Sequence, residues 1–366
     1  MVKLSYLSMQ SHTQALKKIL VIRRDNIGDL VLTTPLLHSL RKQFPTARID
    51  LLTNSYCAPV LDGNTDVDQV MIYEKGHHRG NRSLFRVYFE RLQLIWKLRK
   101  SKYDCIVLGK PSVEPRPLQL ARMIGAPRII GITAPGSPFE KYLTNPLYWE
   151  PSQGQHVAER CMQLLSALGT PESAGPLRIF PDSKLSQNAK NLFNARFGDN
   201  RLIVAVQISS RKIKQRWPID RFMDLIKLLN ARHDCAFVLF WSPGSKDNPM
   251  HPGDDENAQE IIEHFPQDFP ITPYPTKSLT ELIAGLAATQ MMITSDGGAL
   301  HLGAAAGLPI LCFFGNSEAH RWHPWAVPYR LIQEESQDVR TISVEKAANE
   351  FDLLVDSIRA TGQIVI

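Results

Sequence analysis

The feature that most constrains the fold is a strand–turn–helix–strand pattern between Met291 and Phe314. A short apolar run ends at Thr294-Ser295-Asp296, two glycines follow, and small residues at helical spacing lead to a second apolar run from Pro309. Two glycines there allow backbone torsions that other residues resist, and they let a ligand approach the main chain. In an open α/β sheet such a turn lies at the carboxyl end of a strand, where free helix amides favour a phosphate. The stretch therefore predicts a nucleotide-binding turn.

Alternating strand and helix patterns cover most of the 366 residues and predict parallel sheets with both faces covered. The expected strands are Lys17–Arg23, Arg48–Thr53, Val67–Tyr73, Asp104–Leu108 and Arg128–Ile132, then Leu202–Ile208, Ala236–Trp241, Met291–Ser295, Pro309–Phe314 and Arg330–Gln333. The alternation pauses near residues 170–200, which indicates an α/β protein with two Rossmann-like domains facing a cleft. We expect domains at residues 17–175 and 176–345, and a last helix in residues 346–366 that packs back on the first domain.

Composition excludes several classes of protein. No apolar run approaches the roughly 18–20 residues that span a bilayer, and Met1–Leu16 reads as a poorly ordered extension without the apolar core of a signal peptide. The five cysteines lack metal-ligand or CxxC spacing, which favours reduced, buried thiols in a cytoplasmic protein. In the turn His251–Asp255, a helix cap by an aspartate is favoured over a metal site.

The net charge of +6 indicates an acidic partner, and the excess of cations is uneven. The segment from Lys75 to Lys102 contains nine cationic residues and a single carboxylate, Glu90, with aromatic and aliphatic residues between them. A basic amphipathic stretch suits an anionic membrane surface or a phosphorylated acceptor, and equally a solvated helix face that packs its other side. No recognised motif supports a nucleic-acid partner.

A polar turn, Arg24–Asp29, follows the first strand and contains a single glycine, which disfavours a nicotinamide-binding oxidoreductase. Asp29 at this position can accept a proton from an attacking sugar hydroxyl. Taken alone, an aspartate in a first helical turn more often only complements the helix dipole. Asp25 is a second candidate base. Pro35 either kinks the helix that follows or marks where its regular part begins.

Two further segments carry candidate donor-binding groups. The loop Ser209–Pro218 places four cations at a strand end, where they can hold a diphosphate or form a solvated basic loop. In the opening stretch, Asp296 either fixes the turn or binds ligand hydroxyls, and His301 either binds an anion or is structural. The amides there belong to Gly297, Gly298 and Ala299.

Taken together, these motifs resemble those of the glycosyltransferase family 9 heptosyltransferases. The motifs that carry the resemblance are Ile19–Asp29 with Thr34-Pro35 behind it, Val157–Arg160, Arg216-Trp217-Pro218 and Ser295–His301. The resemblance covers the chain from about Lys17 to its C-terminus. The family implies a GT-B fold, no cofactor or essential metal, and inverting transfer from ADP-heptose to the lipid A–linked inner core of lipopolysaccharide. Composition and the basic stretch Lys75–Lys102, rather than the family, predict a cytoplasmic enzyme in peripheral contact with the anionic inner membrane.

The resemblance assigns roles to individual residues. Asp29 becomes the general base, and Arg24 and Asn26 become acceptor-binding residues. The implied donor-binding residues are Ser209, Lys214, Arg216, Asp296, Gly297, Gly298, Ala299 and His301.

Two positions depart from the family pattern. Gln215 stands where some members place the phosphate-binding lysine, which leaves Lys214 and Arg216 as alternatives. Asp296-Gly297-Gly298 replaces Asp-Thr-Gly, so another nucleotide sugar destined for a surface glycan stays open as the donor. A non-catalytic nucleotide-sugar-binding protein is the remaining alternative.

Overall fold

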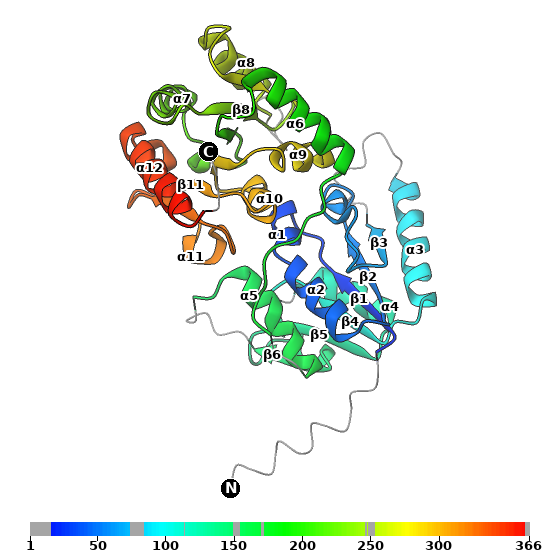
Figure 1. Ribbon diagram of the computed structural model, residues 1–366. Helices are drawn as coiled ribbons and strands as arrows, with labels where there is room; N and C mark the ends of the chain where they lie inside the picture. Colours follow the sequence, from blue (N-terminus) through cyan, green and yellow to red (C-terminus); the bar gives the residue numbers. More distant parts are fainter. Residues whose placement is uncertain are drawn as a thin grey trace. The chain divides into compact units, whose positions relative to one another are not determined.

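The computed structural model describes residues 16–73, 84–112, 114–148, 154–169, 172–245, 247 and 253–362. The expected N-terminal extension, apart from Leu16, lies outside these residues. The chain divides into two compact units, Met1–Pro176 and Leu177–Ile366. Each unit contains one six-stranded sheet of parallel strands (Figure 1).

The N-terminal unit has the strand order β3-β2-β1-β4-β5-β6. Its strands are β1 (Lys18–Ile22), β2 (Arg48–Thr53), β3 (Gln69–Ile72), β4 (Cys105–Leu108), β5 (Arg128–Thr133) and β6 (Asn145–Tyr148). Its helices are α1 (Ile27–Val31), α2 (Thr34–Gln43), α3 (Leu84–Lys100), α4 (Pro115–Ile124) and α5 (Val157–Met162), with 3-10 turns η1 (Ala58–Leu61), η3 (Glu140–Tyr142) and η5 (Gln163–Leu168). This strand order is that of a Rossmann fold, with its switch point between β1 and β4.

Two pairs of helices cover this sheet, α2 with α5 and α3 with α4. The α3–α4 pair packs its apolar residues on the sheet in one core cluster, to which Leu98 and Ile124 belong. Pro35 lies in the first turn of α2, after a break at Leu32 and Thr33. It therefore marks where the regular helix begins, in accord with the fixed φ of proline.

The C-terminal unit repeats this architecture in the order β12-β11-β10-β7-β8-β9, with its switch point between β7 and β10. Its strands are β7 (Ile203–Gln207), β8 (Ala236–Phe240), β9 (Ile271–Pro273), β10 (Met291–Ser295), β11 (Ile310–Phe314) and β12 (Tyr329–Gln333). Its helices are α6 (Ser183–Phe197), α7 (Ile219–His233), α8 (Asp255–His264), α9 (Leu279–Leu286), α10 (Gly298–Ala305), α11 (Ala319–Trp322) and α12 (Val344–Ala360), with η6 (Ile213–Gln215) and η7 (Val339–Thr341).

The last helix, α12, belongs to the C-terminal unit, which differs from the expected packing on the first domain. It contacts α7, β11 and β12. Its apolar stripe, which includes Phe351, Leu354 and Ile358, is buried in the core of this unit. The physical reason is that these side chains recur at helical spacing and complete the layer formed by α7 and α8.

Every strand range expected from the sequence is present, and the two strands that were not expected are the edge strands β6 and β9. Both are short and contain proline, at Pro146 and Pro273. An edge strand tolerates proline because one side of its ladder is unpaired, so the residue pattern of these strands is weak. In the part of the chain that the structure describes, no helix is long and apolar enough to cross a bilayer.

Candidate active site

Polar residues gather at the switch point of each sheet, where the segments after the two central strands diverge. In the N-terminal unit these segments follow β1 and β4, and in the C-terminal unit they follow β7 and β10. Open α/β sheets bind ligands at such points, outside the carboxyl ends of the strands. Each unit therefore has a candidate site at its own switch point.

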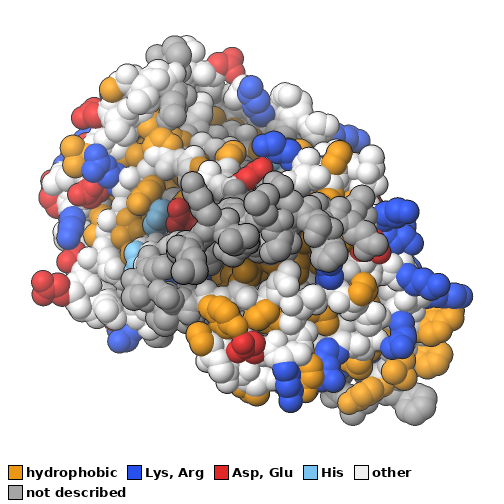
Figure 2. Space-filling view, turned by 90° about the horizontal axis from the view of Figure 1, so that it is seen from below, with side chains coloured by type: hydrophobic (Ala, Val, Ile, Leu, Met, Phe, Trp, Pro, Cys, Tyr) orange, Lys and Arg blue, Asp and Glu red, His pale blue; other side chains and the backbone are white. Residues whose placement is uncertain are grey.

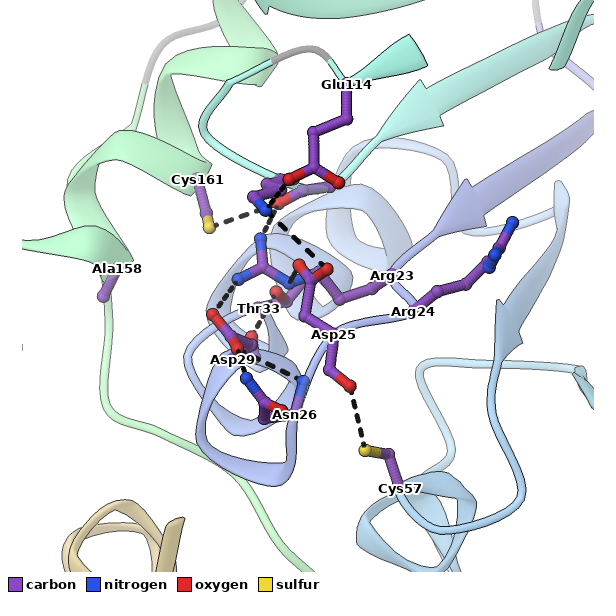
Figure 3. A network of polar contacts seen from close by, with 12 residues as sticks. Arg23, Arg24, Asp25, Asn26, Asp29, Thr33, Cys57, Glu114, Ala158 and Cys161 are labelled. Atoms are coloured by element: carbon purple, nitrogen blue, oxygen red, sulfur yellow. Dashed lines mark hydrogen bonds and ion pairs between the residues drawn. The ribbon is translucent and has the colours of Figure 1, made fainter. Parts of the chain in front are cut away.

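Asp29 lies in the short helix α1 directly after β1, with both carboxylate oxygens hydrogen-bonded (Figure 3). Its Oδ1 accepts a bond from Nη2 of Arg23 at 2.8 Å. Its Oδ2 accepts bonds from the backbone N–H and Nδ2 of Asn26, at 3.2 and 3.0 Å. These three hydrogen bonds orient the carboxylate. The side chain is 14% exposed, so the carboxylate still reaches solvent.

Arg23 is the buried cation that organises this cluster, and its side chain is only 1% exposed. Nη1 donates to the carbonyl of Gly109 after β4, which ties the two strand ends together. Nε lies 3.4 Å from the carboxylate of Asp25. Burial alone lowers the pKa of Arg23, but its neighbours, led by Cys161 and Asp29, raise it above its ordinary value. A charged guanidinium thus lies between two carboxylates.

The two aspartates of this turn, Asp25 and Asp29, lie in different surroundings. Burial raises the pKa of Asp25, against the opposing effect of Arg23. Asp25 lines a small pocket between the segments after β1 and β4, whereas Asp29 does not. The residues that line this pocket are Ile22, Arg24, Asp25, Leu108, Lys110, Ser112, Glu114 and Pro117. The proline-rich segment after β4 therefore contributes to a pocket at the switch point.

The two expected acceptor residues lie in different places. Arg24 points away from the Asp29 cluster in Figure 3, and its guanidinium carbon lies 3.7 Å from the centre of the Tyr73 ring. Burial lowers the pKa of Arg24. Asn26 caps α1 and forms a capping box with Asp29. Asn26 therefore orients the carboxylate directly, while Arg24 forms part of the wall of the pocket.

In the C-terminal unit, Asp296 joins the turn after β10 to the loop after β7. Its Oδ2 accepts a bond from Nε2 of Gln215 at 2.7 Å and one from Oγ of Ser317 at 2.6 Å. Its backbone carbonyl accepts a bond from Oγ of Ser210 at 3.1 Å. Gln215 also contacts Ser317, after β11, so three strand ends meet at one carboxylate. Asp296 therefore ties the turn after β10 to the loops after β7 and β11.

The two glycines after Asp296 are explained differently from the sequence-based expectation. Gly297 has φ 169°, an extended backbone that any residue adopts, and Gly298 begins α10 in helical conformation. Neither is in the left-handed region, so the expected need for unusual torsions is wrong. A Cβ built on Gly297 would meet no atom of the described residues within 4 Å. The side of Gly297 on which a Cβ would lie is therefore open, and Gly297, Gly298 and Ala299 are all partly exposed.

The two alternative diphosphate cations differ in their contacts. Nη1 of Arg216 pairs with the buried carboxylate of Asp254 at 2.9 Å, and Nε donates to the carbonyl of Ser210 at 2.6 Å. Lys214 is exposed at the centre of η6. It is a minor contributor to the low pKa of Asp338, which the hydrogen bond from Arg340 brings to about 2. Arg216 is thus fixed in the loop, and Lys214 extends from it.

Ser209 and His301 have structural contacts in this unit. Oγ of Ser209 accepts a bond from the backbone N–H of Ser242 at 2.7 Å, which links the ends of β7 and β8. His301 is 3% exposed within α10, and its ring centre lies 6.1 Å from that of Trp322. Asp254 occupies the N-cap position of α8 but uses its carboxylate for Arg216 rather than for capping. His251, the other end of the turn considered for metal, lies outside the described residues.

Sequence reasoning did not identify Gly315 and Ser317 as part of this site, and it included Ser210 only as a member of the loop Ser209–Pro218. A Cβ on Gly315 would come within 2.2 Å of the carbonyl oxygen of Lys214, so only glycine lets β11 end against η6. The available signal was the polar Gly315-Asn316-Ser317 run directly after an apolar strand. Gln215 was noted only as a departure from a lysine, and its role became visible through its bond to Asp296.

Comparison with known proteins gives a consistent result. The family model described as glycosyltransferase family 9 (heptosyltransferase) matches residues 91–350. Lipopolysaccharide heptosyltransferase 3 of Escherichia coli is 25% identical over 92% of this chain and 94% of that protein. Lipopolysaccharide heptosyltransferase 2 of Salmonella typhimurium is 24% identical over 86% of this chain and 88% of that protein.

Solved structures share the fold. The Escherichia coli ADP-heptose lps heptosyltransferase II superposes with a TM-score of 0.73 at 20% identity, covering 93% of this chain and 99% of that one. The Escherichia coli heptosyltransferase WaaC with ADP superposes with a TM-score of 0.72 at 15% identity, covering 92% of this chain and 99% of that one. The two Rossmann-like units are therefore those of a GT-B protein. Because the family model matches more than half of its residues, this chain belongs to glycosyltransferase family 9, the heptosyltransferase family, and is a glycosyltransferase.

Proposed function

We propose that the protein transfers a heptose from ADP-heptose to the inner core of lipopolysaccharide, with inversion at the anomeric carbon and without a metal ion. The donor is suggested by solved relatives whose names include ADP and ADP-2-deoxy-2-fluoro heptose. The acceptor is suggested by the curated relatives, which are named lipopolysaccharide heptosyltransferases.

The observation that carries the proposal is the turn after β10. Its open backbone at Gly297 lies at the start of α10, and the loop that holds Lys214 is tied to the same turn through Gln215 and Asp296. Backbone amides, a helix N-terminus and a nearby cation form a site suited to a diphosphate. We assign donor binding to this unit, with Lys214 in preference to Arg216, because Arg216 is paired with Asp254. Ser209 and His301 then support the donor site by orienting its walls.

In the proposed reaction, Asp29 is the general base. A new bond forms between the acceptor hydroxyl oxygen and the anomeric carbon, while the bond from that carbon to the diphosphate oxygen breaks. The hydroxyl proton passes to the carboxylate of Asp29, and ADP departs with the electron pair. Arg23 and Asn26 orient the carboxylate throughout. Lys214 and the α10 amides stabilise the charge that develops on the departing diphosphate.

The acceptor is assigned to the N-terminal unit, where Asp29 lies and where Arg24 lines the pocket between the segments after β1 and β4, beside a Lys110 that pairs with Glu114. The guanidinium of Arg24 suits the anionic groups of a lipid-linked core saccharide. We place the enzyme at the cytoplasmic face of the inner membrane, in peripheral contact with anionic lipid.

Calorimetric titration with ADP, UDP, GDP and NAD, each with and without EDTA, tests donor class and metal dependence. Preference for ADP that survives EDTA is expected. Preference for UDP or GDP would be compatible with a glycosyltransferase but would contradict ADP-heptose as the donor. Loss of binding in EDTA would contradict metal independence. Incubation with ADP-heptose and a core acceptor, followed by NMR of the new anomeric proton, then tests transfer and inversion. A product that retains the donor configuration would contradict the base role of Asp29.

A further inference from the structure

The helix α3 presents an unusual surface to solvent. Among the described residues, eleven large hydrophobic side chains are exposed, and four of them belong to this one helix. They are Tyr88, Phe89, Leu92 and Trp96, with exposed fractions of 64%, 55%, 63% and 63%. Single exposed apolar residues need no explanation, but a contiguous group of this kind marks an interaction surface.

These four side chains share one side of the helix. At about 100° per residue, Tyr88, Leu92, Trp96 and Phe89 fall within one arc of about 100°. The arc adjoins the side that packs on the sheet, where Leu98 is fully buried and Leu94 and Ile95 pack on the core. The apolar surface of the helix therefore extends beyond the side used for folding and continues into solvent.

Cations border the exposed apolar arc. The helix contains Arg86, Arg91, Lys97, Arg99 and Lys100 against the single carboxylate of Glu90. Glu90 pairs with Arg86 at 3.1 Å, and Nζ of Lys100 lies 4.3 Å from the centre of the Trp96 ring. Figure 2 shows hydrophobic side chains among Lys and Arg side chains on the right-hand rim of the N-terminal unit, the side on which Figure 1 draws α3. Lys75, Arg79 and Arg82 of the basic stretch noted in the sequence lie outside the described residues.

We propose that α3 docks on the surface of an anionic lipid bilayer, with its axis along the membrane plane. Tyr and Trp prefer the interface between lipid and water, because they combine an apolar ring with a polar group. Lys and Arg beside them attract anionic headgroups. A second copy of the chain is a poor occupant, since it would bring two strongly cationic helices together. The proposal rests on the proposed function only for its purpose, which is to bring the acceptor-binding unit to a lipid-linked acceptor.

Co-sedimentation of the full chain with vesicles tests the proposal. Phosphatidylcholine vesicles are compared with vesicles in which part of this lipid is replaced by phosphatidylglycerol. The apolar variant combines Tyr88→Ser, Leu92→Ser and Trp96→Ser. Its matched control combines Leu192→Ser on α6 and Leu353→Ser on α12, which replace leucines of 50% and 47% exposure. The charge variant combines Lys97→Gln and Lys100→Gln, with Lys184→Gln and Lys190→Gln on α6 as its control.

We expect the wild-type chain to bind the anionic vesicles, and binding to weaken when salt is raised from roughly 0.05 to 0.5 M. Each α3 variant should bind at least about tenfold more weakly, because apolar insertion and headgroup attraction both contribute. Both controls should bind as wild type does. Leu92→Glu provides a single substitution at an exposed site in case the triple variant folds poorly.

Unchanged binding by the folded α3 variants would overturn the proposal, as would equal losses in the controls. A wild-type chain that self-associates, and that becomes monomeric in the apolar variant without a change in vesicle binding, would assign the surface to a second copy. ADP titration of the same variants separates this proposal from the proposed function. If the wild-type chain binds ADP but not vesicles, only the docking surface is contradicted. If it binds vesicles but not ADP, only the donor assignment is contradicted.

Discussion

Gln215 donates a hydrogen bond from Nε2 to Oδ2 of Asp296 at 2.7 Å and thereby joins the loop after β7 to the turn after β10. The two residues are 81 positions apart in the chain. Gln215 is 5% exposed, so its neutral amide meets the carboxylate away from water. A buried pair of this kind fixes the geometry of the turn that we assign to the donor diphosphate.

Replacing Gln215 by Glu should destabilise the protein and weaken ADP binding, because two carboxylates would then face each other. We expect a lower melting temperature and an ADP affinity reduced by about tenfold, since a lost buried hydrogen bond costs roughly 1–3 kcal/mol. Gln215→Met has a similar volume but no hydrogen-bond donor. Its melting temperature and ADP affinity should lie between those of wild type and Gln215→Glu. Thermal melts and ADP calorimetry measure both effects. A Glu variant that binds ADP as wild type does would contradict a positioning role for Gln215.

Lys214 and Arg216 should separate ligand binding from stability. Lys214→Gln is expected to weaken ADP binding several-fold with little change in melting temperature, because the side chain is exposed. Arg216→Gln should instead lower the free energy of unfolding by roughly 1–3 kcal/mol, because it leaves the buried carboxylate of Asp254 without its cation. The reverse pattern, with Arg216→Gln stable and unable to bind ADP, would make Arg216 the diphosphate ligand.

Gly297→Ala should reduce ADP affinity without destabilising the chain. The added methyl group meets no atom of the described residues within 4 Å, and φ 169° suits alanine. Any loss of affinity would then report a ligand that approaches the backbone at this point. Gly285→Ala is the contrasting variant, because its Cβ would lie 2.5 Å from Cε1 of Tyr274. It should cost about 1–3 kcal/mol of stability through overpacking. Equal ADP affinity in wild type and Gly297→Ala would contradict the assignment of the diphosphate to the turn at Gly297.

Asp29→Asn should lower kcat roughly 100- to 10,000-fold, the usual contribution of a general base. ADP affinity should stay near its wild-type value, because Asp29 belongs to the other unit. The matched control is Asp220→Asn, which removes an exposed aspartate from the first turn of α7. If Asp29 only complemented a helix dipole, the two variants would behave alike. Single-turnover rates with ADP-heptose and a core acceptor measure the difference.

The raised pKa of Asp25 predicts a specific pH dependence of stability. In the window above the ordinary value of 3.8, the folded protein holds this proton more tightly than the unfolded chain. Stability from this group therefore falls as pH rises through the window, because ionisation becomes easier on unfolding. Asp25→Asn removes this contribution, so the stability of the variant relative to wild type should increase with pH there. Denaturant melts across the acid range measure the slope, and a flat difference would contradict the assignment.

Much of the fold was predictable from the sequence, because burial imposes local patterns. Strands such as β7 and β10 lie in the interior of a covered sheet, so all their residues are buried and they read as apolar runs. The edge strands β6 and β9 lack this pattern, because half-exposed positions place little constraint on residue type. The same limit applies to α12, whose stripe predicts a helix but not the sheet that it covers.

The candidate site was only partly predictable, for a different physical reason. Asp29, the cations of the β7 loop and the turn at Gly297 follow strand ends, and strand ends can be read from the sequence. The partners that orient them cannot, since Gln215 meets Asp296 only because β10 lies beside β7 in the sheet. Arg23 likewise reads as the end of a strand until folding buries it between Asp25 and Asp29. Which segments form strands and helices follows from the periodicity of burial along the chain. Which distant polar groups meet follows from strand order, because neighbouring strands bring the segments after them together.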